Sequence, residues 1–154
     1  MSLGFDTLLP LQRTTLAAFV LLALMLPLRG AHAGALDGIW TVEDGRAKVR
    51  IAPCGDGFCG NVISIEEPND PATGAPWRDK NNINPVQRNR PLLGIKVATG
   101  MKPDGSSSRW IGRVYSIDYG REYAGSITLL SPSRLKIEGC QMMICQSEIW
   151  TKAD

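Results

Sequence analysis

Short β-rich runs, separated by turn residues at intervals of about eight to twelve residues, fill the chain from residue 38 onward. Gly, Pro, Asn and Asp mark the turns, and Asp44-Gly45 is a dipeptide typical of β-hairpins. No long segment keeps the 3.6-residue period of an amphipathic helix, so we expect little helix. This rhythm is typical of all-β sandwiches and barrels.

The runs predict eight strands, at residues 39–43, 47–53, 61–66, 93–99, 109–117, 121–130, 134–139 and 144–152. Most connections are tight, which favours an all-β fold: an eight-stranded antiparallel up-and-down barrel with one long loop between strands 3 and 4. Closure into a barrel also removes exposed sheet edges. A β-sandwich of the same strands is the alternative, but sandwiches usually need more long crossovers. The barrel interior is either filled by side chains or holds one small ligand.

Two runs differ in how clearly they show an inward face. On the fourth, Ile95 and Val97 are predicted to point inward. On the fifth, two alternating sets compete, namely Trp110, Gly112 and Val114 against Ile111, Arg113 and Tyr115. An inward arginine would need a buried partner, so we expect Arg113 to face solvent.

The first 33 residues are typical of an export signal. An apolar run of 13 residues, from Leu16 to Leu28, precedes an A-x-A cleavage site that ends at Ala33. The run is shorter than the roughly 20 residues that span a bilayer, which disfavours the alternative of an uncleaved membrane anchor. We therefore predict a cleaved signal peptide, a single mature domain at residues 34–154 without an integral membrane span, and a periplasmic or secreted location in a bacterium.

Charge and histidine content exclude several function classes. Without Arg13, Arg29 and Asp6 of the leader, the remaining chain carries 15 basic and 14 acidic side chains, a net charge of +1. Such a balance does not predict a nucleic-acid partner. His32, the one histidine, also lies in the leader. The mature chain therefore lacks the imidazole of Ser-His-Asp sites and of most metal sites, and we predict no cofactor and no metal ion.

Four cysteines in a small exported domain predict disulfides, with three possible pairings. In a meander, successive turns lie at alternate ends of the barrel. Cys54 and Cys59 flank the second turn, whereas Cys140 and Cys145 flank the seventh, about 20 Å away. A disulfide joins Cα atoms within about 7 Å, so the barrel predicts Cys54–Cys59 and Cys140–Cys145. Their spacing is not the C-x-x-C of thiol oxidoreductases, which favours a structural role over a redox role.

The connection at residues 67–91, here called the flap, is unusually long at about 25 residues. Five prolines restrict it, and Trp77 within it requires an apolar support. We predict an ordered flap packed over one barrel end. Ion pairs among Asp79, Arg88 and Arg90 are expected to hold it, in preference to contacting a ligand.

The chain resembles a known family. Gly-Ile-Trp at residues 38–40 is similar to the G-x-W that opens calycin barrels such as lipocalins and avidins. Residues 38–151 resemble domain of unknown function family 2147 through the segments GIWTVEDGRAKVRI, CGDGFCGNVI, DKNNINPVQRNRPLLG, GRVYSIDYGREYAG, LKIEGC and IWTK. Where this family usually has a proline in the fifth turn, the chain has Tyr119. The resemblance implies a lipocalin-like barrel and supplies no established activity or catalytic residue.

Turn order predicts which residues share a barrel end. The flap, the fifth turn and the seventh turn are odd-numbered, so Trp77, Tyr119, Met142 and Met143 are expected to converge at one end. In the lipocalin resemblance this is the open, ligand-binding end, and methionine and aromatic side chains suit an adaptable apolar contact. Alternatively, flap and turn pack on each other and close the barrel.

Trp40 and Lys152 are expected at the opposite, closed end as a structural cation–π pair.

Three functions follow, in order of preference. The first is an exported lipocalin-like barrel that binds a small apolar or amphipathic molecule at its open end. The second is a protein-interaction or envelope-assembly module whose barrel is filled and whose partner is an envelope protein. An enzyme is least favoured. Its candidate carboxylates, Glu66, Glu67 and Asp70, are better interpreted as a solvated strand end, so no catalytic residue is assigned.

Overall fold

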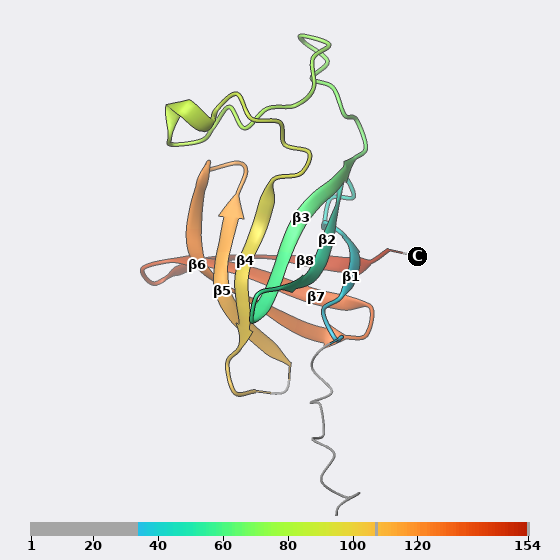
Figure 1. Cartoon of the computed structure of the whole chain (residues 1–154), viewed down its shortest axis with the longest axis vertical. Coiled ribbons are helices and arrows are strands. Elements are labelled where there is room, and N and C mark those ends of the chain that lie inside the picture. Colours follow the sequence, from blue (N-terminus) through green and yellow to red (C-terminus); the bar gives the residue numbers. More distant parts are fainter. Residues whose placement is uncertain (1–33, 107, 154) are drawn as a thin grey trace, which may run out of the picture. The chain divides into compact units, whose positions relative to one another are not determined.

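Eight antiparallel strands close into one barrel in the computed structural model, which describes residues 34–106 and 108–153 (Figure 1). The strands are β1 (Gly38–Thr41), β2 (Ala47–Cys54), β3 (Gly57–Ile65), β4 (Lys96–Pro103), β5 (Arg109–Ser116), β6 (Arg121–Ser131), β7 (Arg134–Gln141) and β8 (Ile144–Lys152). Each strand pairs with the next, and β1 pairs with β8, which confirms the predicted meander. One short 3₁₀ turn, η2 (Pro85–Gln87), is the helical element of the described residues.

The predicted signal peptide and its cleavage site lie outside the described residues. Within those residues, no helix is long and apolar enough to cross a membrane.

Alternation along the strands sorts side chains to the two faces of the sheet. On β2, Val49 and Ile51 are buried, while Lys48 and Arg50 between them are exposed. The inward residues form one cluster that includes Leu36, Trp40, Val49, Ile51, Phe58, Val62, Ala98, Met101, Trp110, Ile127, Leu135 and Trp150. Burying each large apolar side chain contributes about 1.5–3 kcal/mol, so this cluster is the main source of stability.

Glycines on the inner face let these side chains fill the barrel. A Cβ atom on Gly112 would lie 2.7 Å from Met101 Sδ, and one on Gly125 would lie 2.6 Å from Val114 Cγ2. Both distances are far below the roughly 3.5–4.0 Å of a carbon contact. The interior therefore has no space for even an added methyl group at these positions.

The inward faces of β4 and β5 are settled by their pairing. Ala98 pairs with Val114 and both are buried, so Trp110, Gly112 and Val114 form the inner face of β5. On β4, Ala98 and Met101 fill the interior, whereas Val97 was predicted to do so. The pairing of β3 with β4 shifts register between Gly60 and Asn61, which pair with Ala98 and Lys96, and this irregularity breaks the alternation on which the prediction relied.

Both disulfides have the predicted pairing. Cys54 bonds to Cys59 across the β2–β3 turn, and Cys140 bonds to Cys145 across the β7–β8 turn. No free cysteine remains among the described residues. Two closed disulfides indicate an oxidising, extracytoplasmic compartment.

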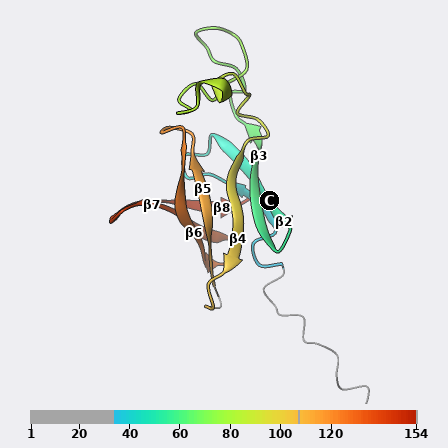
Figure 2. The same cartoon turned by 60° about the vertical axis from the view of Figure 1, so that its left-hand side comes forward.

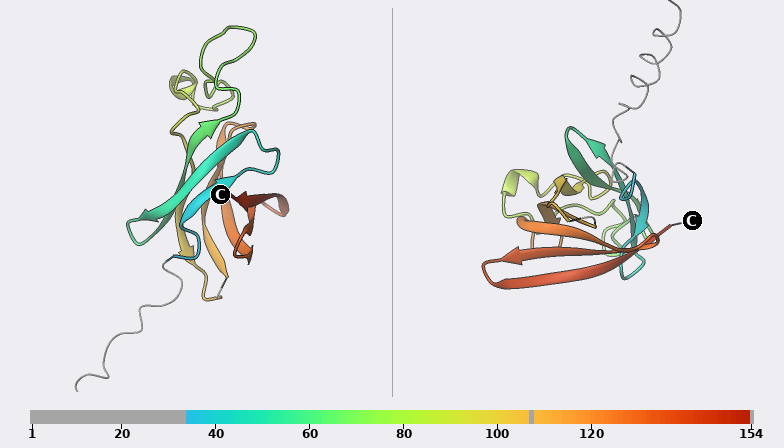
Figure 3. Two further views of the ribbon diagram at one scale, coloured as in Figure 1. Left: turned by 90° about the vertical axis from the view of Figure 1, so that its right-hand side faces the viewer. Right: turned by 90° about the horizontal axis from the view of Figure 1, so that it is seen from below.

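The seam between β1 and β8 is short. β1 has four residues, and only Trp40↔Lys152 and Thr41↔Thr151 pair across the seam. β7 and β8 continue to pair with each other up to Gln141↔Ile144. Their hairpin consequently extends sideways beyond the barrel wall (Figures 1 and 3).

Candidate ligand-binding site

The flap is an ordered structure. Isolated β-bridges join Asn69 to Pro76 and Arg78 to Pro91, so its outgoing and returning arms run together. At its far end Asn84 caps η2, because the Asn84 side chain accepts a hydrogen bond of 3.1 Å from the Val86 backbone N–H. Figures 1 and 2 show the flap beyond the ends of β3 and β4, with η2 close to the β5–β6 turn.

A buried carboxylate ties the flap to the barrel. Asp79 is fully buried and accepts hydrogen bonds from the Tyr115 hydroxyl at 2.7 Å and from Asn82 Nδ2 at 2.7 Å. Arg90 donates to the same carboxylate through Nε at 2.8 Å. The carboxylate thus has a counter-ion and several donors, which is what a buried charge requires. We call this set of four residues the Asp79 cluster.

Tyr115 is the member of the Asp79 cluster that belongs to the barrel wall. Burial, and then the hydrogen bond to Asp79, raises the pKa of Tyr115 to about 12. The phenol therefore remains a hydrogen-bond donor at neutral pH. Arg90 also lies over the Tyr115 ring, 5.1 Å from its centroid. These contacts fix the position along β5 at which the flap packs.

The predicted flap ion pairs are present only in part. Arg90 and Asp79 form one, with Nη2 and Oδ2 at 2.8 Å. Arg88 instead donates from Nε to the backbone oxygen of Asn82, at 2.8 Å. Arg90 is therefore the salt-bridge partner of Asp79, while Arg88 holds the backbone of the flap at Asn82.

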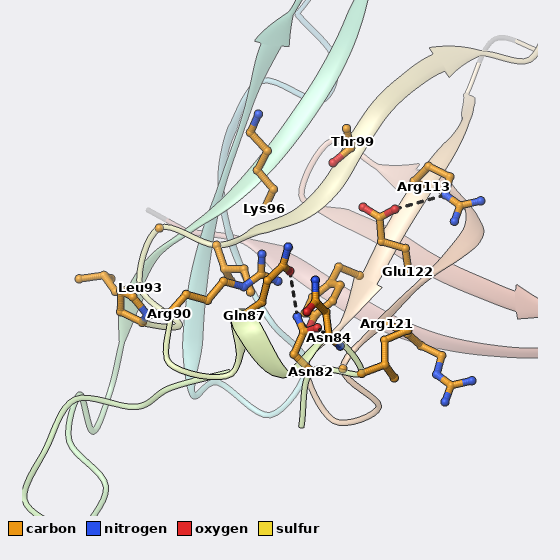
Figure 4. Close-up of a pocket in the computed structure, with 16 residues that line it drawn as sticks. Asn82, Asn84, Gln87, Arg90, Leu93, Lys96, Thr99, Arg113, Arg121 and Glu122 are labelled. Carbon is orange, nitrogen blue, oxygen red and sulfur yellow. Dashed lines mark hydrogen bonds and ion pairs between the residues drawn. The ribbon is translucent and has the colours of Figure 1, made fainter. Parts of the chain in front are cut away.

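A groove of about 960 Å³ opens between the flap and the outer face of the sheet. Its wall on the barrel side comes from outward positions, since Thr99 pairs with Arg113 and Tyr115 with Glu122, beside the inward Ala98 and Val114. The sixteen lining residues are Asn82, Ile83, Asn84, Gln87, Arg90, Pro91, Leu93, Gly94, Ile95, Lys96, Thr99, Arg113, Tyr115, Gly120, Arg121 and Glu122. Figure 4 shows polar side chains from both walls around this space.

The groove has an excess of positive charge. Four basic side chains line it, and they are Arg90, Lys96, Arg113 and Arg121. Glu122 is the one acidic lining residue and pairs with Arg113 at 3.6 Å. Among the salt bridges of residues 34–106 and 108–153, none involves Lys96 or Arg121. Two cations are therefore available to an incoming anion.

Apolar side chains border the same groove. Ile83 is 59% exposed and Leu93 is 55% exposed, and both line it. An amphipathic molecule suits this combination, because its charged head and its apolar body would each meet a matching surface.

Trp77 and Tyr119 lie in two separate environments. Trp77 is half-buried, donates from Nε1 to the Glu67 backbone oxygen at 2.8 Å, and lines a small apolar cleft of about 170 Å³ within the flap. Tyr119 stacks edge-on against Tyr123, and its hydroxyl accepts a hydrogen bond of 3.3 Å from Gln146 Nε2.

Met142 and Met143 project from the β7–β8 turn and are 96% and 97% exposed. The structure therefore does not bring the four predicted ligand-binding residues together. Odd-numbered turns were expected at one barrel end. The β7–β8 hairpin instead extends sideways, which carries its turn away from the flap (Figure 1).

The remaining candidates have structural partners. Lys152 Nζ lies 5.5 Å from the centroid of the Trp40 ring, and Trp40 Nε1 donates to the Leu36 backbone oxygen at 2.9 Å. Asp70 pairs with Lys80 at 3.7 Å and accepts a hydrogen bond from the Ala72 backbone N–H, as expected of a turn residue. Glu138, Cys140 and Cys145 lie close enough to share a metal ion, but the disulfide uses both sulfurs.

Sequence reasoning missed the groove. Its cations occupy outward positions on three strands and the flap, and each one alone looks like an ordinary solvated residue. The available signal was Arg113 and Tyr115 in alternation on the fifth run. Only the register between strands and the path of the flap turn this pattern into a site.

One comparison with a solved structure agrees with the barrel. A solved structure of protein HP1028 from Helicobacter pylori, described as belonging to the lipocalin family, is 20% identical with a TM-score of 0.63, and the match covers 77% of this chain and 83% of that one. At this identity the likeness shows the fold alone. A redesigned β-barrel is 15% identical with a TM-score of 0.43, over 80% of this chain and 95% of that one.

No curated protein matches the chain. A family model does match residues 38–152, and its description is "Uncharacterized protein conserved in bacteria (DUF2147)". The match covers the whole barrel, from the start of β1 to the end of β8. The chain is therefore a lipocalin-like member of the DUF2147 family.

Proposed function

We propose that this protein binds a small amphipathic molecule with an anionic head group, in the groove between the flap and the outer face of β4, β5 and β6. The observation that carries the proposal is the charge of the groove, where Arg90 and Arg113 are paired with Asp79 and Glu122 while Lys96 and Arg121 form no salt bridge with the described residues. The apolar part of the ligand would lie against Ile83 and Leu93, which are exposed at the groove.

A site inside the barrel fits the structure less well. The interior holds bulky side chains, including Trp40, Met101 and Trp110, none of which is exposed. These three side chains line neither the groove nor the small cleft beside Trp77. The ligand site proposed here therefore lies on the outer wall beside the flap, whereas the sequence predicted it at the open end of the barrel. We place the protein in the periplasm or outside the cell, where its disulfides persist.

A pair of fluorescent probes tests this proposal. Anilinonaphthalene sulfonate carries an anionic head on an apolar body, and N-phenylnaphthylamine is the same body without the charge. We expect the sulfonate to bind more tightly, and added salt to weaken its binding because exposed charges are screened. Fluorescence titration and calorimetry measure both affinities.

Matched charge variants locate the site. Lys96→Gln with Arg121→Gln removes the two unpaired groove cations, and we expect the sulfonate to bind about tenfold more weakly, or about 1.4 kcal/mol. Lys48→Gln with Arg134→Gln makes the same charge change at exposed positions outside the groove and should leave binding unchanged. Equal losses in both double variants, or equal affinity for the two probes, would show that the groove is not an anion site.

A second candidate function is that of a protein-interaction module. The filled barrel and the exposed Met142 and Met143 favour it. Its surface lies on the β7–β8 hairpin, away from the groove, so both functions are compatible with one molecule.

A further inference from the structure

Part of β8 is a free sheet edge. β8 begins at Ile144, but only Thr151 and Lys152 pair with β1. Further along the edge, the Ile149 backbone N–H bonds to the Glu43 side chain at 3.3 Å. In the part of the chain that the structure describes, no strand pairs with the outer side of residues 144–148. Figure 3 (right) shows β8 at the border of its hairpin.

Two residues direct their backbone groups toward this free edge. Alternate residues of an antiparallel strand point their N–H and C=O groups to the same side. Ile149 points toward the β1 side, so Ser147 and Cys145 do as well. The Cα atoms of Cys140 and Cys145 are 4.0 Å apart, close to the roughly 4.5 Å of a pair that shares no backbone hydrogen bonds and far from the 5.5 Å of a bonded pair. Both observations place the Cys145 backbone groups on the open side.

The edge is held in shape and lacks the usual protection. The Cys140–Cys145 disulfide and the regular β7–β8 register keep the strand extended up to Ile144. Natural sheet edges are commonly blocked by lysine, proline or a bulge. Between Ile144 and Glu148 there is no lysine and no proline, and Glu148 is the only charged residue.

Apolar side chains continue from the end of this edge. Met142, Met143 and Ile144 are 96%, 97% and 75% exposed. Met142 also has a φ of 55°, a conformation that glycine adopts more readily than methionine. Turn geometry therefore does not explain why an apolar side chain stands here.

We propose that the free edge of β8 pairs with β8 of a second copy of this chain. An antiparallel arrangement centred on Gln146 places Cys145 of each copy opposite Ser147 of the other. Both residues have their backbone groups on the open side, so each opposed pair exchanges two hydrogen bonds. The two-fold axis makes the contact self-complementary, which is the commonest form of a protein dimer.

Side chains select this register. It sets Ile144 opposite Glu148 of the second copy, and so keeps the two Glu148 carboxylates apart. Register shifts that oppose Glu148 to Glu148 would be disfavoured by like charge. The same register brings Met143 to the height of Ile149 in the second copy, apolar against apolar. Residues 34–154 carry a net charge of only +1, so overall repulsion is weak.

Sedimentation equilibrium and photo-crosslinking test the dimer. The full chain, expressed with its leader and purified after export, is examined up to about 1 mM, a range that captures weak association. We expect a monomer–dimer equilibrium. A benzoylphenylalanine placed at Gln146 is expected to give a crosslinked dimer in which residues 144–148 of both copies are joined.

Proline and lysine substitutions provide the matched comparison. Ser147→Pro removes an edge N–H that does not bond to β7, and we expect at least a tenfold loss of dimer affinity, whereas Ser147→Ala keeps the N–H and should dimerise as the wild type. Ile144→Lys adds edge protection without changing the backbone and should also weaken the dimer tenfold or more, which covers the case of a Ser147→Pro chain that does not fold.

Three results would overturn the proposal. One is a protein that stays monomeric up to about 1 mM. Another is a crosslink from position 146 that reaches only a different protein, which would assign the edge to a foreign strand. The last is a dimer affinity that stays at the wild-type value in folded Ser147→Pro and Ile144→Lys proteins.

Discussion

The flap and the β7–β8 turn are both odd-numbered connections of the barrel, yet different interactions hold them in place. The flap is polar and is fastened by a buried ion pair between Asp79 and Arg90, with Tyr115 and Asn82 as donors. The β7–β8 turn is apolar and is fastened by a covalent bond between Cys140 and Cys145.

This difference decides what each region can expose. A connection held by buried side chains must cover them, and the flap covers Asp79 while forming one wall of the groove. A connection held by a disulfide needs no packing, so Met142 and Met143 remain almost fully exposed. We expect disruption of the two regions to have separable effects on ligand binding and on dimerisation.

The largest effect is expected from Asp79→Ala. Without the carboxylate, Arg90 becomes a half-buried charge with no counter-ion and Tyr115 loses its acceptor. Breaking a fully buried pair costs about 3–5 kcal/mol, and the partial exposure of Arg90 reduces our expectation to about 2–4 kcal/mol. Urea unfolding measures the change, and binding of the anionic probe should be lost with it. Asp118→Ala, at an exposed turn position, is the control and should change stability little.

The next effect compares the two disulfides. Each closes a loop of the same length, with a sequence separation of 5, so replacing either pair by serine should cost about 2 kcal/mol. Only the variant lacking Cys140 and Cys145 should lose dimerisation, and neither should lose probe binding. Identical dimerisation in the two double variants would contradict the assignment of the free edge to β8.

Tyr115→Phe should have a smaller effect that depends on pH. Loss of the hydrogen bond to a carboxylate is expected to cost about 1.5–2 kcal/mol at neutral pH. In the wild type the pKa of Tyr115 is raised to about 12. The unfolded chain releases this proton near pH 10, before the folded chain does, so the wild type loses stability as pH rises from about 10 to 12.

The Phe variant has no such ionisation, and the stability difference between the two proteins should shrink over that interval. Denaturant midpoints measured at matched pH give this difference directly. A constant difference across the interval would show that Tyr115 ionises equally in both states.

The smallest effect has the opposite sign. Met142→Gly should relieve the positive φ and stabilise the fold by about 0.5–1 kcal/mol, because a left-handed conformation is unfavourable for a side chain. Met143→Gly is the matched control, since Met143 has no positive φ, and it should give no gain. Thermal unfolding compares the two. Both substitutions remove an exposed apolar side chain, so a stabilisation shared equally by both would point to solvation and not to backbone strain.

How far the sequence predicts this molecule depends on how local the relevant interactions are. Most strand positions follow from alternation and turns, although β3 begins at Gly57 and β4 at Lys96, where the sequence predicted residues 61 and 93. The disulfide pairing follows from turn parity. The inward face of β4 does not, because the register shift against β3 between Lys96 and Ala98 has no marker in the sequence. The anion groove depends on where the flap packs against the barrel. The hydrogen bond between Asp79 and Tyr115, which are 36 positions apart in the sequence, sets that position. Such distances are set by the folded sheet and are not visible in any local pattern.

The short seam between β1 and β8 also governs how the barrel opens. Its two pairs join residues about 110 positions apart, so forming it carries a large loop-closure cost for little contact. β5 and β6, by comparison, pair along eight consecutive positions across a tight turn. Amide protons of β1 should therefore exchange with solvent through partial opening of the seam, well before those of β5 and β6 exchange through global unfolding. The closed barrel thus resembles a curved sheet whose first and last strands are weakly joined. Transient opening of the β1–β8 seam would lengthen the exposed edge of β8.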